Sequence, residues 1–164
     1  MVMKRILKFG IGVFLMCFCL AASAQIKVVS PHKNLIINVM RCEVQGEYCV
    51  VDMLFENVGP SDVKAQSASD LNFNKGYDDM GNVYGTTYDN MIFMYVGDMQ
   101  NNLPGFGEAF DLPSGIPVKV RAMLKNINEI ATSIKRLDLT LYFNYSPWKL
   151  GKQRVRISNI PISR

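Results

Sequence analysis

The stretch that decides the fold is residues 34–56, which read NLIINVMRCEVQGEYCVVDMLFE. Its second half places apolar side chains at alternate positions, namely Cys49, Val51, Met53 and Phe55. Asp52 and Glu56 fall on the opposite face, and this period of two is typical of a strand with one buried side. Gln45-Gly46 favours a two-residue hairpin turn, because glycine adopts positive φ at little steric cost. The stretch therefore predicts a β-hairpin that contributes one face to a core.

The hairpin also predicts how the cysteines within it are arranged. With strands at 34–44 and 47–56, Cys42 lies directly opposite Cys49. Opposed residues of an antiparallel pair have Cα atoms about 4.5–5.5 Å apart, a distance that a disulfide spans. We therefore predict a structural disulfide, which contributes roughly 2–3 kcal/mol on the chain-entropy model. Free or redox-active thiols and a zinc site are the alternatives, although the spacing is not Cys-x-x-Cys and two further zinc ligands are missing.

The rest of the chain after residue 56 continues the β pattern. The clearest strand has its odd positions in the expected core, at Leu137, Leu139, Leu141 and Phe143. Turn residues separate the weaker candidate strands, which are 63–74, 76–78, 83–88, 91–96, 107–112, 118–124 and 155–160. Residues 126–133 lack the alternation and predict a loop or a single helical turn. Seven to nine strands at this spacing predict an all-β, two-layer antiparallel sandwich, with a barrel as the alternative.

The first 24 residues read as a secretory signal. Their start is basic, through Lys4, Arg5 and Lys8. An apolar run at 11–21 follows, and residues 22–24 read Ala-Ser-Ala, the small-x-small pattern at which signal peptidase cleaves. We expect a signal helix and cleavage before Gln25, which leaves a single domain at 25–164 with no membrane span, in the periplasm or on the cell surface. An uncleaved membrane anchor and a lipoprotein are the alternatives, although the run is shorter than the roughly 20 apolar residues of a span.

Residues 25–164 carry 15 basic and 14 acidic side chains, and so small a net charge indicates no nucleic-acid partner. The charges are unevenly placed, because residues 25–111 have a net charge of −7 and residues 112–164 a net charge of +8. One interpretation is that strands of the two halves interleave and their opposite charges pair. The other is an exposed basic edge that faces an anionic partner, either an envelope protein or an anionic glycan. That edge consists of Lys149, Lys152, Arg154 and Arg156.

Three motifs give the chain a resemblance to a known class of domain. Residues 49–59, CVVDMLFENVG, resemble the strand and exit turn of bacterial extracytoplasmic immunoglobulin-like domains. Residues 79–84, DMGNVY, and residues 110–115, FDLPSG, are similar to a hairpin and a late turn of the same domains. The Ala-Ser-Ala-Gln ending of the signal is similar to that of small secreted proteins of Bacteroides-like Gram-negative bacteria. The resemblance implies an immunoglobulin-like sandwich outside the cytosol and transfers no catalytic residue.

The sequence offers no set of catalytic residues. A hydrolytic triad needs a base beside its nucleophile, and the single histidine, His32, lies near the expected new N-terminus. We expect His32 at the surface of a flexible leading segment. The sequence contains no phosphate-binding loop, dinucleotide fingerprint or paired-histidine zinc motif. We therefore expect no enzymatic activity and no cofactor.

Two groups of residues are candidates for binding. Asp78, Asp79 and Asn82 form an oxygen-rich segment and are weak calcium candidates. Their spacing does not follow the twelve-residue calcium loop, so we prefer tight-turn chemistry. The second group combines Trp148 and Tyr145 with Lys149 and Lys152, where a sugar ring can stack on the aromatic side chains. The alternative is that Trp148 covers one end of the core.

These observations predict a secreted, non-catalytic binding or interaction module of the cell envelope with an unidentified ligand. A carbohydrate-active protein, either a sugar-binding module or a small hydrolase, is the first alternative. A subunit of a surface assembly is the second.

Overall fold

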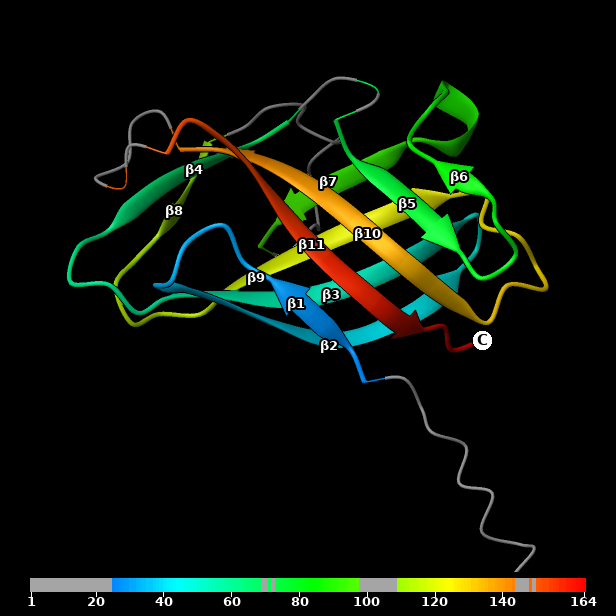
Figure 1. Cartoon of the computed structure of the whole chain (residues 1–164), viewed down its shortest axis with the longest axis horizontal. Helices are drawn as coiled ribbons and strands as arrows, with labels where there is room; N and C mark the ends of the chain where they lie inside the picture. The colour runs from blue at the N-terminus through cyan, green and yellow to red at the C-terminus, as the bar shows by residue number, and fades with distance from the viewer. Residues whose placement is uncertain (1–24, 69–70, 72, 98–108, 144–147, 149) are drawn as a thin grey trace, which may run out of the picture.

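The computed structural model describes residues 25–68, 71, 73–97, 109–143, 148 and 150–164. Within these ranges, eleven β-strands form two antiparallel sheets that pack face to face (Figure 1). The expected all-β, two-layer antiparallel sandwich is therefore confirmed. The strands outnumber the seven to nine expected because several span only two to four residues. The expected signal helix falls outside the described residues.

The larger sheet, sheet A, has the strand order β1-β11-β10-β4-β8, and β5 pairs with both β10 and β6. Its strands are β1 (Lys27–Val29), β4 (Val63–Ser67), β5 (Lys75–Asp78), β6 (Val83–Tyr84), β8 (Ala109–Leu112), β10 (Ser133–Tyr142) and β11 (Lys152–Pro161). Sheet B has the order β2-β3-β9-β7. Its strands are β2 (Leu35–Gln45), β3 (Tyr48–Asn57), β7 (Ile92–Val96) and β9 (Val118–Lys125). Strands from both halves of the sequence therefore interleave in each sheet.

A short 3₁₀ turn, η1 (Tyr88–Asn90), leads into β7. Among the described residues, we find no helix with the length and apolar character that a membrane crossing requires.

The core lies between the sheets, where β10 and β11 cross in front of β3 and β9 (Figure 1). The residues that the sequence predicted for the core are all fully buried, and they are Cys49, Val51, Met53, Phe55, Leu137, Leu139, Leu141 and Phe143. On β11, Val155 and Ile157 enter the same core. Because side chains alternate along a strand, Arg154 and Arg156 point away from the core, onto the outer face of sheet A.

The β2–β3 hairpin differs from the expected one in its register. Gln45 pairs with Tyr48, so the two loop residues are Gly46 and Glu47, and Gly46 has φ +60°. A glycine at the first loop position suits the type II′ turn that matches the twist of a hairpin. As a result, Cys42 pairs with Val51 rather than with Cys49. The predicted direct opposition of the cysteines is therefore wrong, although both still face the core.

The segment after β11 leaves sheet A and reaches the edge of sheet B. Ser163 forms a parallel bridge with Glu43 of β2. The Ser163 N–H donates to the Cys42 carbonyl at 2.9 Å, and the Val44 N–H donates to the Ser163 carbonyl at 3.0 Å. Backbone hydrogen bonds thus connect the two sheets along this side of the sandwich.

Candidate functional site

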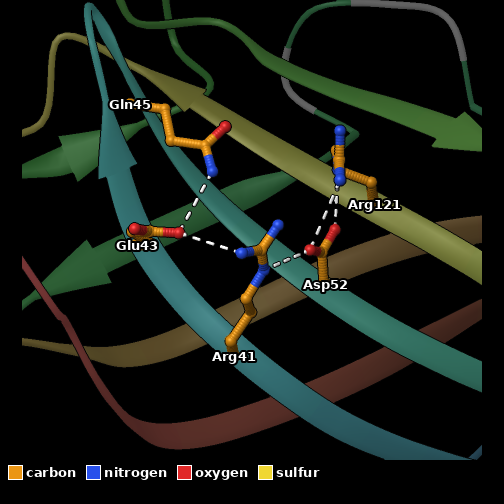
Figure 2. Close-up of polar contacts among 5 residues, drawn as sticks. All are labelled: Arg41, Glu43, Gln45, Asp52 and Arg121. Carbon is orange, nitrogen blue, oxygen red and sulfur yellow. Dashed lines mark hydrogen bonds and ion pairs between the residues drawn. The ribbon is translucent and has the colours of Figure 1, made fainter.

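The outer face of sheet B carries a buried carboxylate held by arginines from both neighbouring strands (Figure 2). Asp52 of β3 lies between Arg41 of β2 and Arg121 of β9 in the strand register. The Nε atoms of Arg41 and Arg121 donate to separate Asp52 oxygens, each at 2.6 Å. Burial opposes ionisation, but the hydrogen bonds from Arg121 and Arg41 outweigh it and hold the pKa of Asp52 below its ordinary value. Asp52 is therefore a buried anion at neutral pH.

A β-bulge places Arg41 in this network. The register of β2 shifts between Val39 and Arg41, and the shift turns the odd-numbered residues after it to the outer face. Arg41 Nη1 also donates to Glu43 Oε2 at 3.1 Å, and Gln45 Nε2 donates to the same oxygen at 3.1 Å (Figure 2). The network contains two arginines and two carboxylates, so its charges balance.

Sheet A carries a second carboxylate of the same kind on its own outer face. Asp138 of β10 is 1% exposed. It accepts hydrogen bonds from Arg156 Nε of β11 at 2.8 Å and from Arg136 Nε of its own strand at 2.9 Å. Burial opposes ionisation of Asp138, but these two arginines outweigh it and lower the pKa of Asp138. The Arg136 guanidinium also lies over the Tyr77 ring, 5.4 Å from its centroid.

Beside Asp138, the outer face of β11 presents three cations at alternate positions. Lys152, Arg154 and Arg156 lie opposite Tyr142, Thr140 and Asp138 of β10, respectively. The Lys152 ammonium lies 3.8 Å from the centroid of the Phe73 ring. The Arg154 side chain is exposed and makes no hydrogen bond or ion pair with the residues that the structure describes. The basic edge predicted from the sequence comprises these three residues and Lys149, which falls outside the described residues. Lys152 and Arg154 are exposed, Arg156 is half-buried, and the three share one face.

The two outer faces differ in charge. Around Asp138, the structure describes no second carboxylate that takes the place of Glu43. Two further cations, Lys27 of β1 and Lys75 of β5, project from the same side of sheet A. The outward side chains of β1, β5, β10 and β11 that the structure describes form what we call the basic face. Leaving aside Lys75, whose ammonium donates to the Gly85 carbonyl, its charged members near Asp138 are Lys27, Arg136, Lys152, Arg154 and Arg156, five cations around the one carboxylate that the structure describes there.

No family model, curated protein or solved structure matches the chain. Its function must therefore follow from the chemistry of its own residues.

Trp148 lies at one end of the sandwich, packed against the core. One face of its ring stacks on His32, with centroids 4.1 Å apart and ring planes 20° apart, and Phe143 packs against it at 5.4 Å. His32, which the sequence placed at the surface, is half-buried. A sugar ring would have to displace His32 to stack on that side of Trp148. Of the residues grouped with Trp148 in the sequence analysis, Tyr145 and Lys149 fall outside the described residues, and Lys152 lies on β11.

The calcium candidates have protein partners that account for their placement. Asp78 Oδ1 accepts hydrogen bonds from the backbone N–H groups of Met80 and Asn82, both at 2.9 Å. Its other oxygen accepts the Tyr84 hydroxyl at 2.8 Å, and burial raises the pKa of Tyr84 to about 12. Asp79 accepts the Thr132 N–H at 3.0 Å. No cluster of three acidic, histidine or cysteine side chains suited to a metal occurs among the described residues.

Cys42 and Cys49 meet diagonally across the hairpin. Their sulfurs are 3.3 Å apart, and the two residues are present as thiols. Both lie in the core, with exposed fractions of 4% and 0%. The hydrogen bond to Cys49 and burial raise the pKa of the Cys42 thiol.

A cavity of about 380 Å³ opens at the hairpin end of the sandwich, between the β2–β3 turn and the β9–β10 loop. Its charged lining residues are Glu47, Glu129 and Arg164. Arg164 donates to the Asn128 carbonyl at 2.9 Å. The cavity lies apart from the basic face, and its charged lining is two acids and one base.

The residues that orient the basic face were missed in the sequence. Asp138, Arg136 and Tyr77 belong to strands that a period-two pattern locates, but the pattern does not say which strands are neighbours. The available signal was in β10, where Arg136 and Asp138 stand two residues apart and therefore share a face.

Proposed function

We propose that the chain is an exported, non-catalytic binding module that holds an anionic partner on the basic face of sheet A. The observation that supports this function is the excess of cations around Asp138, in contrast to the balanced network around Asp52. Like charges crowded on one surface repel each other, and an anionic partner relieves that repulsion. Arginine suits this task because its planar guanidinium binds carboxylate and phosphate groups with two parallel hydrogen bonds.

Export is part of the same proposal. The basic start, the apolar run and the Ala-Ser-Ala ending of residues 1–24 support removal of a signal peptide before Gln25. An immunoglobulin-like relationship is supported by the two-layer antiparallel architecture and by the three sequence motifs. The domain then works in the periplasm or on the cell surface.

Delivery to an oxidising compartment supports closure of the cysteine pair. Cys42 and Cys49 each lose a proton and together give two electrons to a disulfide-bearing oxidant, which leaves as a dithiol. Their sulfurs must approach from 3.3 Å to the bonded distance of about 2.0 Å, a small movement for two side chains on one face of a hairpin. Because both thiols are buried in the folded domain, we expect the bond to form before the core is fully packed.

Binding is tested by charge reversal on the two outer faces. The exported protein is immobilised and exposed to an envelope extract at low and at high salt, beside the variants Arg154→Glu and Lys125→Glu. Lys125 lies on the outer face of sheet B, so its reversal makes the same change in net charge away from the basic face. We expect wild type and Lys125→Glu to retain an acidic component at low salt that Arg154→Glu does not retain. Retention that is independent of Arg154, or no retention at low salt, would overturn the proposal.

A further inference from the structure

We infer that the ligand of the basic face is a linear acidic polysaccharide lying along β11, and that Asp138 is a positioning residue for Arg156. This inference rests on the proposed function and adds the class of ligand and the way in which the site is held in shape.

The spacing of the β11 cations suits a polymer with repeated charges. Side chains two residues apart on one strand are separated by about 6.4–6.8 Å, so Lys152, Arg154 and Arg156 form a row of cations along the strand. Lys27 on β1 and Arg136 on β10 extend the positive charge on either side of this row. A single small anion would contact one of these groups, whereas an extended polyanion contacts several in succession.

Asp138 binds the Nε side of the Arg156 guanidinium and leaves its terminal nitrogens available to a ligand. The bond runs from Arg156 Nε to Asp138 Oδ1, and no described residue takes the two terminal nitrogens of Arg156. The Arg156 side chain is 43% exposed, although the carboxylate below it is almost fully buried. Its guanidinium therefore lies in one orientation with terminal N–H groups toward solvent, ready for a carboxylate or sulfate group.

The aromatic side chains around the cations favour a sugar polymer among extended polyanions. Tyr142 lies opposite Lys152, and Phe73 packs edge-on against Tyr142 with ring centroids 6.4 Å apart. Tyr77 lies under Arg136. These aromatic side chains, at the two ends of the face beside Lys152 and Arg136, offer apolar surface to the C–H faces of sugar rings, and the cations offer opposite charge to their acidic groups.

The direction in which Asp138→Asn changes the affinity distinguishes a positioning role from an effect of net charge alone. Asp138→Asn removes a negative charge from the basic face, and on charge alone this substitution strengthens the binding of a polyanion. If Asp138 orients Arg156, the same substitution weakens binding, because Arg156 loses its fixed direction. Asp52→Asn is the matched control, since it removes the carboxylate of the other arginine network on the opposite sheet.

The test measures the affinity of the exported protein for polygalacturonate, heparin and neutral dextran by biolayer interferometry at low and high salt. We expect salt-sensitive binding to at least one acidic polymer and none to dextran, with polygalacturonate against heparin separating carboxylate from sulfate recognition. Arg154→Glu should weaken binding about tenfold and Asp138→Asn about threefold, while Lys125→Glu and Asp52→Asn stay within about twofold of wild type. Circular dichroism spectra confirm that each variant is folded.

Where an acidic polymer binds, three results overturn the inference. They are equal binding to dextran, equal losses in Arg154→Glu and Lys125→Glu, and unchanged or tighter binding by Asp138→Asn; the last removes the positioning role. If neither acidic polymer binds while Arg154-dependent retention from the envelope extract persists, the ligand class is wrong and the proposed function stands. If that retention is absent as well, both are wrong.

Discussion

Replacing Asp52 with asparagine tests how much its arginine network stabilises the fold. The substitution keeps the side-chain volume and removes the charge. Arg121 then loses its ionised partner while its own side chain is only 19% exposed, so water replaces little of the lost interaction. Hydrogen bonds to charged groups contribute about 1.5–3 kcal/mol each, and a buried charge without its partner is destabilising. We expect the free energy of unfolding to fall by about 2–4 kcal/mol.

Asp138→Asn is the matched comparison, because this carboxylate also has two arginine partners. Arg136 and Arg156 are 39% and 43% exposed, so water solvates their guanidinium groups once the carboxylate is gone. We expect a smaller loss of about 1–2 kcal/mol, in line with partly exposed pairs. Urea unfolding followed by circular dichroism at pH 7 measures both variants. A loss for Asp138→Asn equal to or larger than that for Asp52→Asn would refute the reasoning from arginine exposure.

The pH dependence of the Asp52→Asn effect provides a second check. The folded-state pKa of Asp52 lies below its ordinary value of 3.8, so its stabilisation is present above that value and is lost as the pH falls through the folded-state pKa. The difference between wild type and Asp52→Asn should therefore shrink below about pH 4. A difference that stays constant from pH 7 to pH 3 would contradict an ionised Asp52.

Three further predictions concern other parts of the fold. In urea unfolding, Gly85→Ala should lower the free energy of unfolding by more than about 3 kcal/mol, and Gly81→Ala should lower it by about 1–2 kcal/mol. The two glycines have similar φ, +85° at Gly85 and +87° at Gly81. A Cβ at Gly85 would lie 2.1 Å from the Asn74 carbonyl oxygen, whereas one at Gly81 would meet no atom within 4 Å. Equal losses of unfolding free energy in the two variants would therefore disprove the clash. Tyr84→Phe should lower the free energy of unfolding by about 1–3 kcal/mol, because the Tyr84 hydroxyl donates to Asp78 and accepts from the Asn128 N–H. The same substitution should abolish a tyrosine ionisation near pH 12 in an ultraviolet titration. Mass spectrometry of protein purified without reductant and alkylated in denaturant should show a chain starting at Gln25 with neither Cys42 nor Cys49 modified. An intact Met1 with both Cys42 and Cys49 alkylated would contradict export and the disulfide together.

The core was predictable because its signal is local. Period-two alternation at 49–55 and 137–143 assigns each side chain to a face without any knowledge of its neighbours. The same property explains why the error in the hairpin turn was harmless to the core. Moving the loop from Gln45-Gly46 to Gly46-Glu47 changes which residues pair, but it keeps both cysteines on the buried face.

The burial of Asp52 and Asp138 was not predictable in this way. Alternation assigns both to an outer face, where a carboxylate is expected to be solvated. Asp52 is buried by partners 11 and 69 residues away, and the second of them depends on the pairing of β3 with β9. A local pattern contains no information on strand order, so the cations of β11 were found from the sequence while the residue that orients Arg156 was not.

The bridge between Ser163 and β2 has a mechanical consequence. Ser163 follows β11 of sheet A by two residues and forms hydrogen bonds with β2, the edge strand of sheet B. These bonds connect the two sheets beside the β2–β3 hairpin that carries Cys42 and Cys49. A load that pulls on the C-terminus reaches these backbone bonds before it reaches β11. We therefore expect the hydrogen bonds between Ser163 and β2 to break first, while β11 and its row of cations stay in place.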